Sequence, residues 1–109
     1  MATSLQVKEL SGHYKKATIM FFELRRYPLK PGKRDEWVKW MDEEIIPFQM
    51  SKGMVVLASF VDEENDTYVW IRRFESQEEK DALYEAVYKS DYWLNEASPK
   101  VGEYIDRDN

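Results

Sequence analysis

The sequence predicts an α+β fold, one antiparallel sheet with two helices on the same face. Three patterns in the chain predict it. Residues 18–27 alternate their side chains with the two-residue period of a strand. Residues 33–48 repeat apolar side chains with the period of a helix. Residues 54–61 and 67–74 are two further β-rich segments joined by the polar turn 62–66, which predicts a hairpin.

The first strand and the first helix have clear end signals. The strand is expected to stop at Pro28, because Pro31 and Gly32 form a tight turn directly after it. The helix should not continue far past Ile46, since Pro47 lacks the N–H that a continuing helix needs. Its apolar stripe consists of Trp37, Met41, Ile45 and Phe48, with Trp40 beside it.

The second helix is predicted to begin at a capping box formed by Ser76 and Glu79. In such a box each side chain satisfies a backbone N–H of the first turn. The helix should run to about Ser90. Its inner stripe would be Leu83, Ala86 and Val87.

The two ends of the chain carry weaker patterns. Residues 91–99 are expected to form a loop or short helix anchored by Trp93, and residues 101–107 a short last strand. Residues 1–16 have little periodicity, which predicts a mobile arm or leader. A single domain would then cover residues 17–109.

This β-α-β-β-α-β order is that of the ferredoxin-like sandwich. We expect the aliphatic pairs Phe22/Leu24 and Val69/Ile71 to face the helices, which assigns their neighbours to the opposite face. That open face would carry Phe21, Glu23, Arg25, Tyr27, Tyr68, Trp70, Arg72 and Phe74. Such a face is too aromatic to stay exposed. The sequence therefore predicts a homodimer in which two such sheets pack face to face and leave a polar-lined cavity between them.

Composition narrows the classes of function. The chain has 109 residues, a formal net charge of −5 and no cysteine. The acidic balance disfavours nucleic-acid binding, and the lack of cysteine excludes disulfides and thiolate metal sites. No apolar run approaches the roughly 20 residues of a membrane span. We expect a cytoplasmic protein that has no bound metal or cofactor and does not associate with membranes.

Glu23, Arg25, Tyr27 and Arg72 are the candidate chemical groups. Glu23 and Arg25 share a strand face, and the neighbouring strand brings Arg72 close. The arginines could hold an oxyanion or a polar ligand group, while Glu23 or Tyr27 transfers a proton. Alternatively, the charges form an ion-pair cluster at a dimer interface, which perturbs titration without chemistry.

Aromatic residues form the second candidate feature. Phe21, Tyr68, Trp70 and Phe74, together with Tyr27, could form a wall for a flat ligand. The alternative is interface packing, where aromatic residues are enriched. The lone histidine, His13, lies in the predicted arm and is not expected to bind metal.

Four segments resemble the NIPSNAP family. Residues 23–27, ELRRY, and 29–33, LKPGK, are similar to its opening motif, while residues 71–76, IRRFES, and 90–93, SDYW, are similar to later segments. The resemblance runs from about Ala17 to Ile105, with Trp70 and Arg72 shifted relative to the family pattern.

The resemblance implies a dimeric α/β barrel, the fold of the superfamily to which that family belongs. It implies a homodimer that binds a small apolar or aromatic molecule in its barrel. Two alternatives stay open. One is a cofactor-free monooxygenase, cyclase or isomerase-like enzyme of the same superfamily. The other is a non-catalytic assembly or interaction protein.

Overall fold

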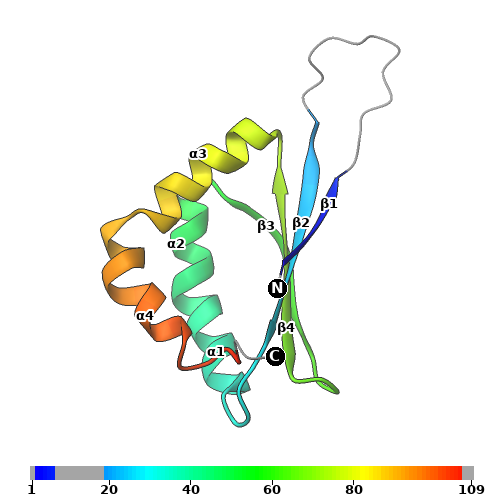
Figure 1. Cartoon of the computed structure of the whole chain (residues 1–109), viewed down its shortest axis with the longest axis vertical. Coiled ribbons are helices and arrows are strands. Elements are labelled where there is room, and N and C mark those ends of the chain that lie inside the picture. The colour runs from blue at the N-terminus through cyan, green and yellow to red at the C-terminus, as the bar shows by residue number, and fades with distance from the viewer. Residues whose placement is uncertain (1, 7–18, 107–109) are drawn as a thin grey trace.

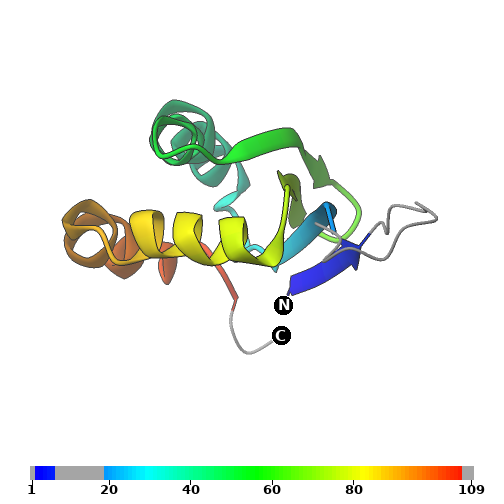
Figure 2. The ribbon, with the colours of Figure 1, turned by 90° about the horizontal axis from the view of Figure 1, so that it is seen from above.

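The structure, a computed structural model, describes residues 2–6 and 19–106. It contains one antiparallel sheet with the strand order β1-β2-β4-β3. The strands are β1 Ala2–Gln6, β2 Phe21–Pro28, β3 Val55–Asp62 and β4 Thr67–Phe74. All helices lie on one side of this sheet (Figures 1 and 2). The predicted α+β class, with helices over one face of an antiparallel sheet, is confirmed.

The first helical segment runs further than predicted. It consists of α1 Arg34–Trp40, the π-helical turn η1 Met41–Ile45 and α2 Ile46–Ser51. In η1 the Ile46 N–H bonds to the Met41 carbonyl, five residues back. This wider turn places Pro47 in the first turn of α2, where a missing N–H is tolerated. The predicted stop at Pro47 is therefore wrong.

A second π-helical turn, also followed by a proline in the first turn of an α-helix, occurs near the C-terminus. The π-helical turn η2 Trp93–Ala97 precedes α4 Ser98–Val101. Here the Ser98 N–H bonds to the Trp93 carbonyl, and Pro99 sits in the first turn of α4. The segment predicted as a loop or short helix is thus helical.

The second predicted helix is α3, Gln77–Tyr88. Ser76 Oγ accepts a hydrogen bond from the Glu79 N–H at 3.0 Å, which confirms the predicted N-cap. The Glu79 carboxylate accepts from the Glu75 N–H at 3.0 Å, one residue before the N-cap. The predicted inner stripe is only partly correct, because Val87 is buried but Ala86 is exposed.

The predicted orientation of the sheet is wrong. Glu23 and Arg72 are completely buried against the helices, and so are Phe21, Trp70 and Phe74. Arg25 lies on the same face, within 3.2 Å of the Tyr84 hydroxyl of α3. The physical reason is that large aromatic side chains bury more apolar area than the aliphatic pairs. Parity then carries the charged residues inward with them.

The face away from the helices carries apolar side chains with two arginines among them. Phe22, Leu24 and Ile71 lie on it, partly buried, together with Val69, Arg26 and Arg73. At the β3 edge, Leu57 is 51% exposed and Phe60 is 50% exposed. This outer face has no covering element in the described part of the chain (Figure 2).

The edge of the sheet beside β2 also differs from prediction. The predicted last strand at 101–107 does not form over its described residues: α4 extends to Val101, and Ile105 makes only an isolated bridge with Leu29. The β1 segment, within the predicted arm, occupies that edge instead. Met1, residues 7–18 and the position of the predicted domain boundary lie outside the described residues.

The helix-facing core divides into two apolar clusters. The larger consists of Leu29, Trp37, Trp40, Met41, Ile45, Tyr68, Trp70, Ala97 and Tyr104. The smaller consists of Phe21, Met54, Phe74 and Val87. On β4, Arg72 lies between Trp70 of one cluster and Phe74 of the other, so a charged group separates the two. No helix in the described segments is long and apolar enough to cross a membrane.

Ser76→Ala should lower the free energy of unfolding by about 1 kcal/mol, because the Glu79 N–H loses its acceptor. Urea unfolding followed by circular dichroism measures the change. Ser51→Ala is the control, since it removes an exposed hydroxyl that bonds only to Phe48 of its own helix. Equal effects in both variants would contradict the capping role.

Candidate functional site

A buried ion pair joins the two inner strands, β2 and β4, on the helix-facing side of the sheet. Glu23 of β2 and Arg72 of β4 are register partners, and Arg72 Nη2 donates to Glu23 Oε1. Neither residue is exposed to solvent. Removing two charges from water costs several kcal/mol per ion, so such a pair needs further hydrogen-bonding partners.

The helices supply the partners of Arg72. Its Nη1 donates to Gln49 Oε1 at 2.8 Å and to the Tyr88 hydroxyl at 2.9 Å. Its Nη2 also donates to the Tyr84 hydroxyl at 2.7 Å. The guanidinium carbon lies 4.5 Å from the centre of the Trp70 ring, a cation–π distance. The arginine is thus held from both the sheet and the helix layer.

Glu23 is enclosed in the same way. Tyr84 donates its hydroxyl to the carboxylate at 2.7 and 2.8 Å, and Lys80 Nζ lies 2.8 Å from Oε2. Lys80, Tyr84 and Tyr88 are spaced four residues apart, which puts them on one face of α3. Together with Gln49, they were missed as site residues. Their four-residue spacing is the sequence signal that could have identified them.

The surroundings of Glu23 determine its protonation state. Burial raises the pKa of its carboxyl group, but Arg72 and the hydrogen bonds from Lys80 and Tyr84 outweigh burial and lower it to about 2. Burial, reinforced by the bond to Glu23, raises the pKa of Tyr84 despite nearby Arg72. A carboxylate with so low a pKa is a weak proton acceptor at neutral pH.

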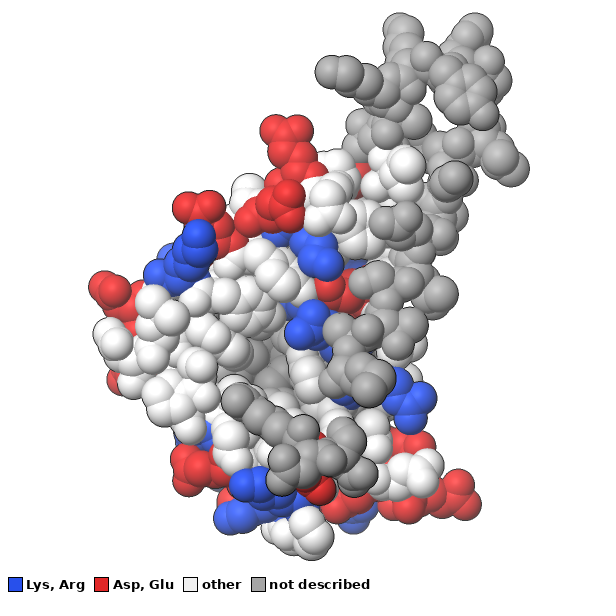
Figure 3. All heavy atoms as spheres, in the orientation of Figure 1, with Lys and Arg blue, Asp and Glu red and all other residues white. Residues whose placement is uncertain are grey.

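A cavity of about 280 Å³ lies on the same side of the sheet, beside the ion pair. Figure 3 shows a hollowed, mostly uncharged surface with positive and negative side chains along one side of it. All four tryptophans of the chain line the cavity. The lining residues are Arg25, Tyr27, Trp37, Trp40, Met41, Ile45, Gln49, Trp70, Tyr88, Trp93, Val101 and Ile105.

The predicted site residues separate into three places. Arg25, Tyr27 and Trp70 line the cavity. Glu23 and Arg72 form the ion pair next to it. The others pack in the core: Phe21 and Phe74 in the smaller cluster, and Tyr68 in the larger.

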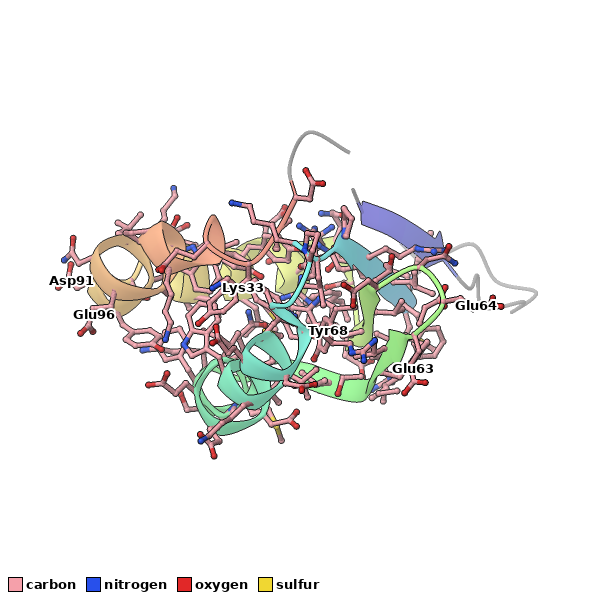
Figure 4. The ribbon with its side chains drawn as sticks, turned by 90° about the horizontal axis from the view of Figure 1, so that it is seen from below. Lys33, Glu63, Glu64, Tyr68, Asp91 and Glu96 are labelled. Carbon is pink, nitrogen blue, oxygen red and sulfur yellow. The ribbon has the colours of Figure 1, made fainter. Side chains whose placement is uncertain are left out.

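Tyr68 lies between α1 and the sheet (Figure 4). Its burial raises the pKa of its hydroxyl to about 12. Tyr68, which was predicted to contact a ligand, packs in the larger core cluster and is not among the residues that line the cavity.

The polar groups of the cavity are connected to one another. The Tyr27 hydroxyl accepts from Arg25 Nε at 3.3 Å and from Trp70 Nε1 at 3.1 Å. Gln49 Nε2 donates to the Tyr88 hydroxyl at 3.2 Å. Within the described residues, no group of three or more histidine or acidic side chains could hold a metal ion. The arrangement can therefore hold an apolar molecule and offer it hydrogen bonds at one end.

Glu23→Gln should lower the free energy of unfolding at neutral pH by about 3–5 kcal/mol, because Arg72 loses its buried counter-charge. The pH dependence should change as well. The folded-state pKa lies below the ordinary value of 4.5, so the ionised carboxylate stabilises the fold fully above about pH 4.5. This contribution is lost as the pH falls towards about 2.

Urea unfolding at a series of pH values tests this. The loss of stability between about pH 4.5 and 2 should be smaller in Glu23→Gln than in the unchanged protein. Glu75→Gln is the matched control, since Glu75 pairs with Arg73 at the surface and should contribute at most about 1 kcal/mol. The same pH slope in Glu23→Gln and the unchanged protein would refute the assignment.

Comparison with solved structures supports one family. A NIPSNAP family protein of unknown function from Agrobacterium tumefaciens strain C58 is 27% identical with a TM-score of 0.72, covering 80% of this chain and 79% of that chain. An uncharacterized NIPSNAP-like domain protein from Burkholderia xenovorans is 18% identical with a TM-score of 0.73, covering 81% and 78%. A second A. tumefaciens NIPSNAP family protein is 20% identical with a TM-score of 0.70, covering 91% and 84%.

No functionally curated protein matches the chain. The two structures below 25% identity show the fold alone. The NIPSNAP family model itself matches residues 22–109, which include the first-strand motif, the β4 end and the helix cap. This chain belongs to the NIPSNAP family.

Proposed function

We propose that this NIPSNAP protein binds a small apolar or aromatic molecule in the cavity between its sheet and its helix layer. The cavity of about 280 Å³ supports this, because it is mostly apolar and contains all four tryptophans. Its volume lies near the lower end of ligand pockets, roughly 300–1,000 Å³. A few polar groups at one wall, among them Arg25 and Tyr27, would orient the molecule.

The cavity wall favours binding over proton-transfer catalysis. None of its described lining residues is a carboxylate or a histidine. Glu23 is adjacent, but its carboxylate is held by Arg72, Lys80 and Tyr84. A cofactor-free monooxygenase, cyclase or isomerase would have to use a tyrosine hydroxyl of the wall, Tyr27 or Tyr88, as its proton-transfer group. The enzyme alternative therefore rests on these two side chains.

We also propose that the outer sheet face pairs with a second copy of the chain. On β3, Phe60 is 50% exposed and pairs with Val69, so it extends the apolar surface of Phe22, Leu24 and Ile71. One self-complementary patch is sufficient for a two-fold dimer. In this arrangement, the ligand cavity and the dimer interface use opposite faces of the sheet. The cytoplasmic location and the absence of nucleic-acid partners stay predictions from composition.

Isothermal titration calorimetry with naphthalene-2-carboxamide, a flat uncharged probe, tests the cavity. The unchanged protein should bind it, and Val101→Trp should weaken binding at least about tenfold, because the larger side chain occupies space at the cavity wall. Leu94→Trp is the matched control, since Leu94 is 55% exposed and does not line the cavity. No binding by the unchanged protein, or equal binding by both variants, would overturn the proposal.

Light scattering after size-exclusion chromatography tests the dimer. The unchanged protein should have a mass near twice 13.1 kDa at micromolar concentration. Phe60→Glu should shift it towards the monomer, because burying an unpaired carboxylate costs several kcal/mol. Met50→Glu, a change at an equally exposed apolar side chain on α2, should leave the mass unchanged. A monomeric mass for the unchanged protein would contradict the proposed dimer.

A further inference from the structure

The charges around Glu23 are unbalanced. Three cations surround this single carboxylate: Arg72 in direct contact, Lys80 Nζ at 2.8 Å from Oε2, and Arg25 Nη1 at 3.8 Å from Oε2. The described residues around the cluster thus leave an excess of positive charge. Arg72 is completely buried and cannot contact a ligand. Among the three cations, only Lys80 and Arg25 are partly exposed, so only they can present positive charge to solvent or to the cavity.

Arg25 is the cation that faces the cavity. Its side chain is 27% exposed, and it lines the cavity wall, whereas Arg72 and Lys80 do not. Its hydrogen bonds go to two neutral hydroxyls, Tyr27 at 3.3 Å and Tyr84 at 3.2 Å. The distance of 3.8 Å to Glu23 is too long for a hydrogen bond. A guanidinium has five N–H donors, so most of this fork is left for another acceptor.

The remaining polar groups of the wall are also donors. The Tyr27 hydroxyl already accepts two hydrogen bonds, from Arg25 and Trp70, so its own hydrogen needs an acceptor. The Tyr88 hydroxyl likewise accepts from Gln49 and Arg72. Neither hydroxyl donates to any described residue in the hydrogen bonds that define this network.

A buried donor without a partner points the same way. Trp37 is only 2% exposed and lines the cavity, and its Nε1–H has no acceptor among the described residues. The amide oxygen of Gln49 is engaged by Arg72. The cavity therefore combines an apolar, tryptophan-rich body with positive charge and hydrogen-bond donors. A ligand that matches it has a flat apolar body and an anionic acceptor group.

We propose that the cavity selects aromatic or apolar carboxylates, with the ligand carboxylate bound by the Arg25 guanidinium and the Tyr27 hydroxyl. This inference rests on the proposed binding function and adds the chemical class of the ligand. A planar guanidinium matches a carboxylate with two parallel hydrogen bonds. The cation lies in a partly desolvated wall, where its interaction with an anion is stronger than in water.

A matched pair of probes tests the proposal by calorimetry: naphthalene-2-carboxylate and naphthalene-2-carboxamide, which have the same shape and differ in charge. The unchanged protein should bind the carboxylate at least about tenfold more tightly than the carboxamide. Arg25→Gln should abolish that preference while retaining carboxamide binding, which also reports that the variant is folded. Arg25→Lys should restore part of the preference, because it keeps the charge but not the two parallel bonds.

Arg73→Gln is the control variant. Arg73 is on the same strand as Arg72 but on the opposite sheet face, paired with Glu75 at 2.7 Å, so the preference should be unchanged. Equal affinities of the unchanged protein for the two probes would overturn the charge selection and leave the binding function standing. A carboxylate preference that survives Arg25→Gln would also overturn it. Binding of neither probe would overturn both.

Discussion

The packing of the helices on the sheet depends on one constraint: the buried guanidinium of Arg72 must be neutralised and hydrogen-bonded. Arg72 is completely excluded from solvent, and it lies on β4, one of the two inner strands of the sheet. An uncompensated charge there would be incompatible with a stable core. Glu23 on the neighbouring strand neutralises it, and Gln49, Tyr84 and Tyr88 provide hydrogen bonds from the helix layer. The ion pair thus couples the sheet to both helical segments.

The need to compensate Arg72 explains why the sequence predicted the helices and strands better than it predicted which face of the sheet the helices cover. The alternation in β2 and β4 gives two sets of residues but does not say which set is covered. The uncharged set of Phe22, Leu24 and Ile71 predicted a core beneath the helices, and the set that contains the charges predicted a cavity between two sheets. The structure reverses them, because Tyr84 and Tyr88 hydroxyls on α3 make the inner face suitable for charge. Those partners come from a distant helix, which strand alternation alone does not reveal.

Sequence signals predicted the structure best where a feature depends only on neighbouring residues. The Ser76 cap and the bounds of β4 agree with the sequence, because each depends on neighbouring residues. The prediction that the helix ends near Pro47 was wrong because it depended on the conformation of the preceding turn. Its usual effect assumes an α-helical turn before it, whereas the preceding π turn shifts the bonding by one residue. The candidate site was partly predicted: Arg25, Tyr27 and Trp70 do line a cavity, but on the face thought to be solid core.

The ligand recognition that we propose uses the same geometry that stabilises the core. A carboxylate accepts closely from a limited number of donors, and Arg72, Lys80 and Tyr84 occupy those positions around Glu23. Arg25, two residues along the same strand face, is left at 3.8 Å from the carboxylate. The guanidinium of Arg25 therefore keeps N–H donors that the cluster does not use. Strand periodicity places Arg25 on the sheet face where it lines a cavity that also contains the four tryptophans. In the proposed site, a cation of the structural network is therefore also the polar end that binds the ligand.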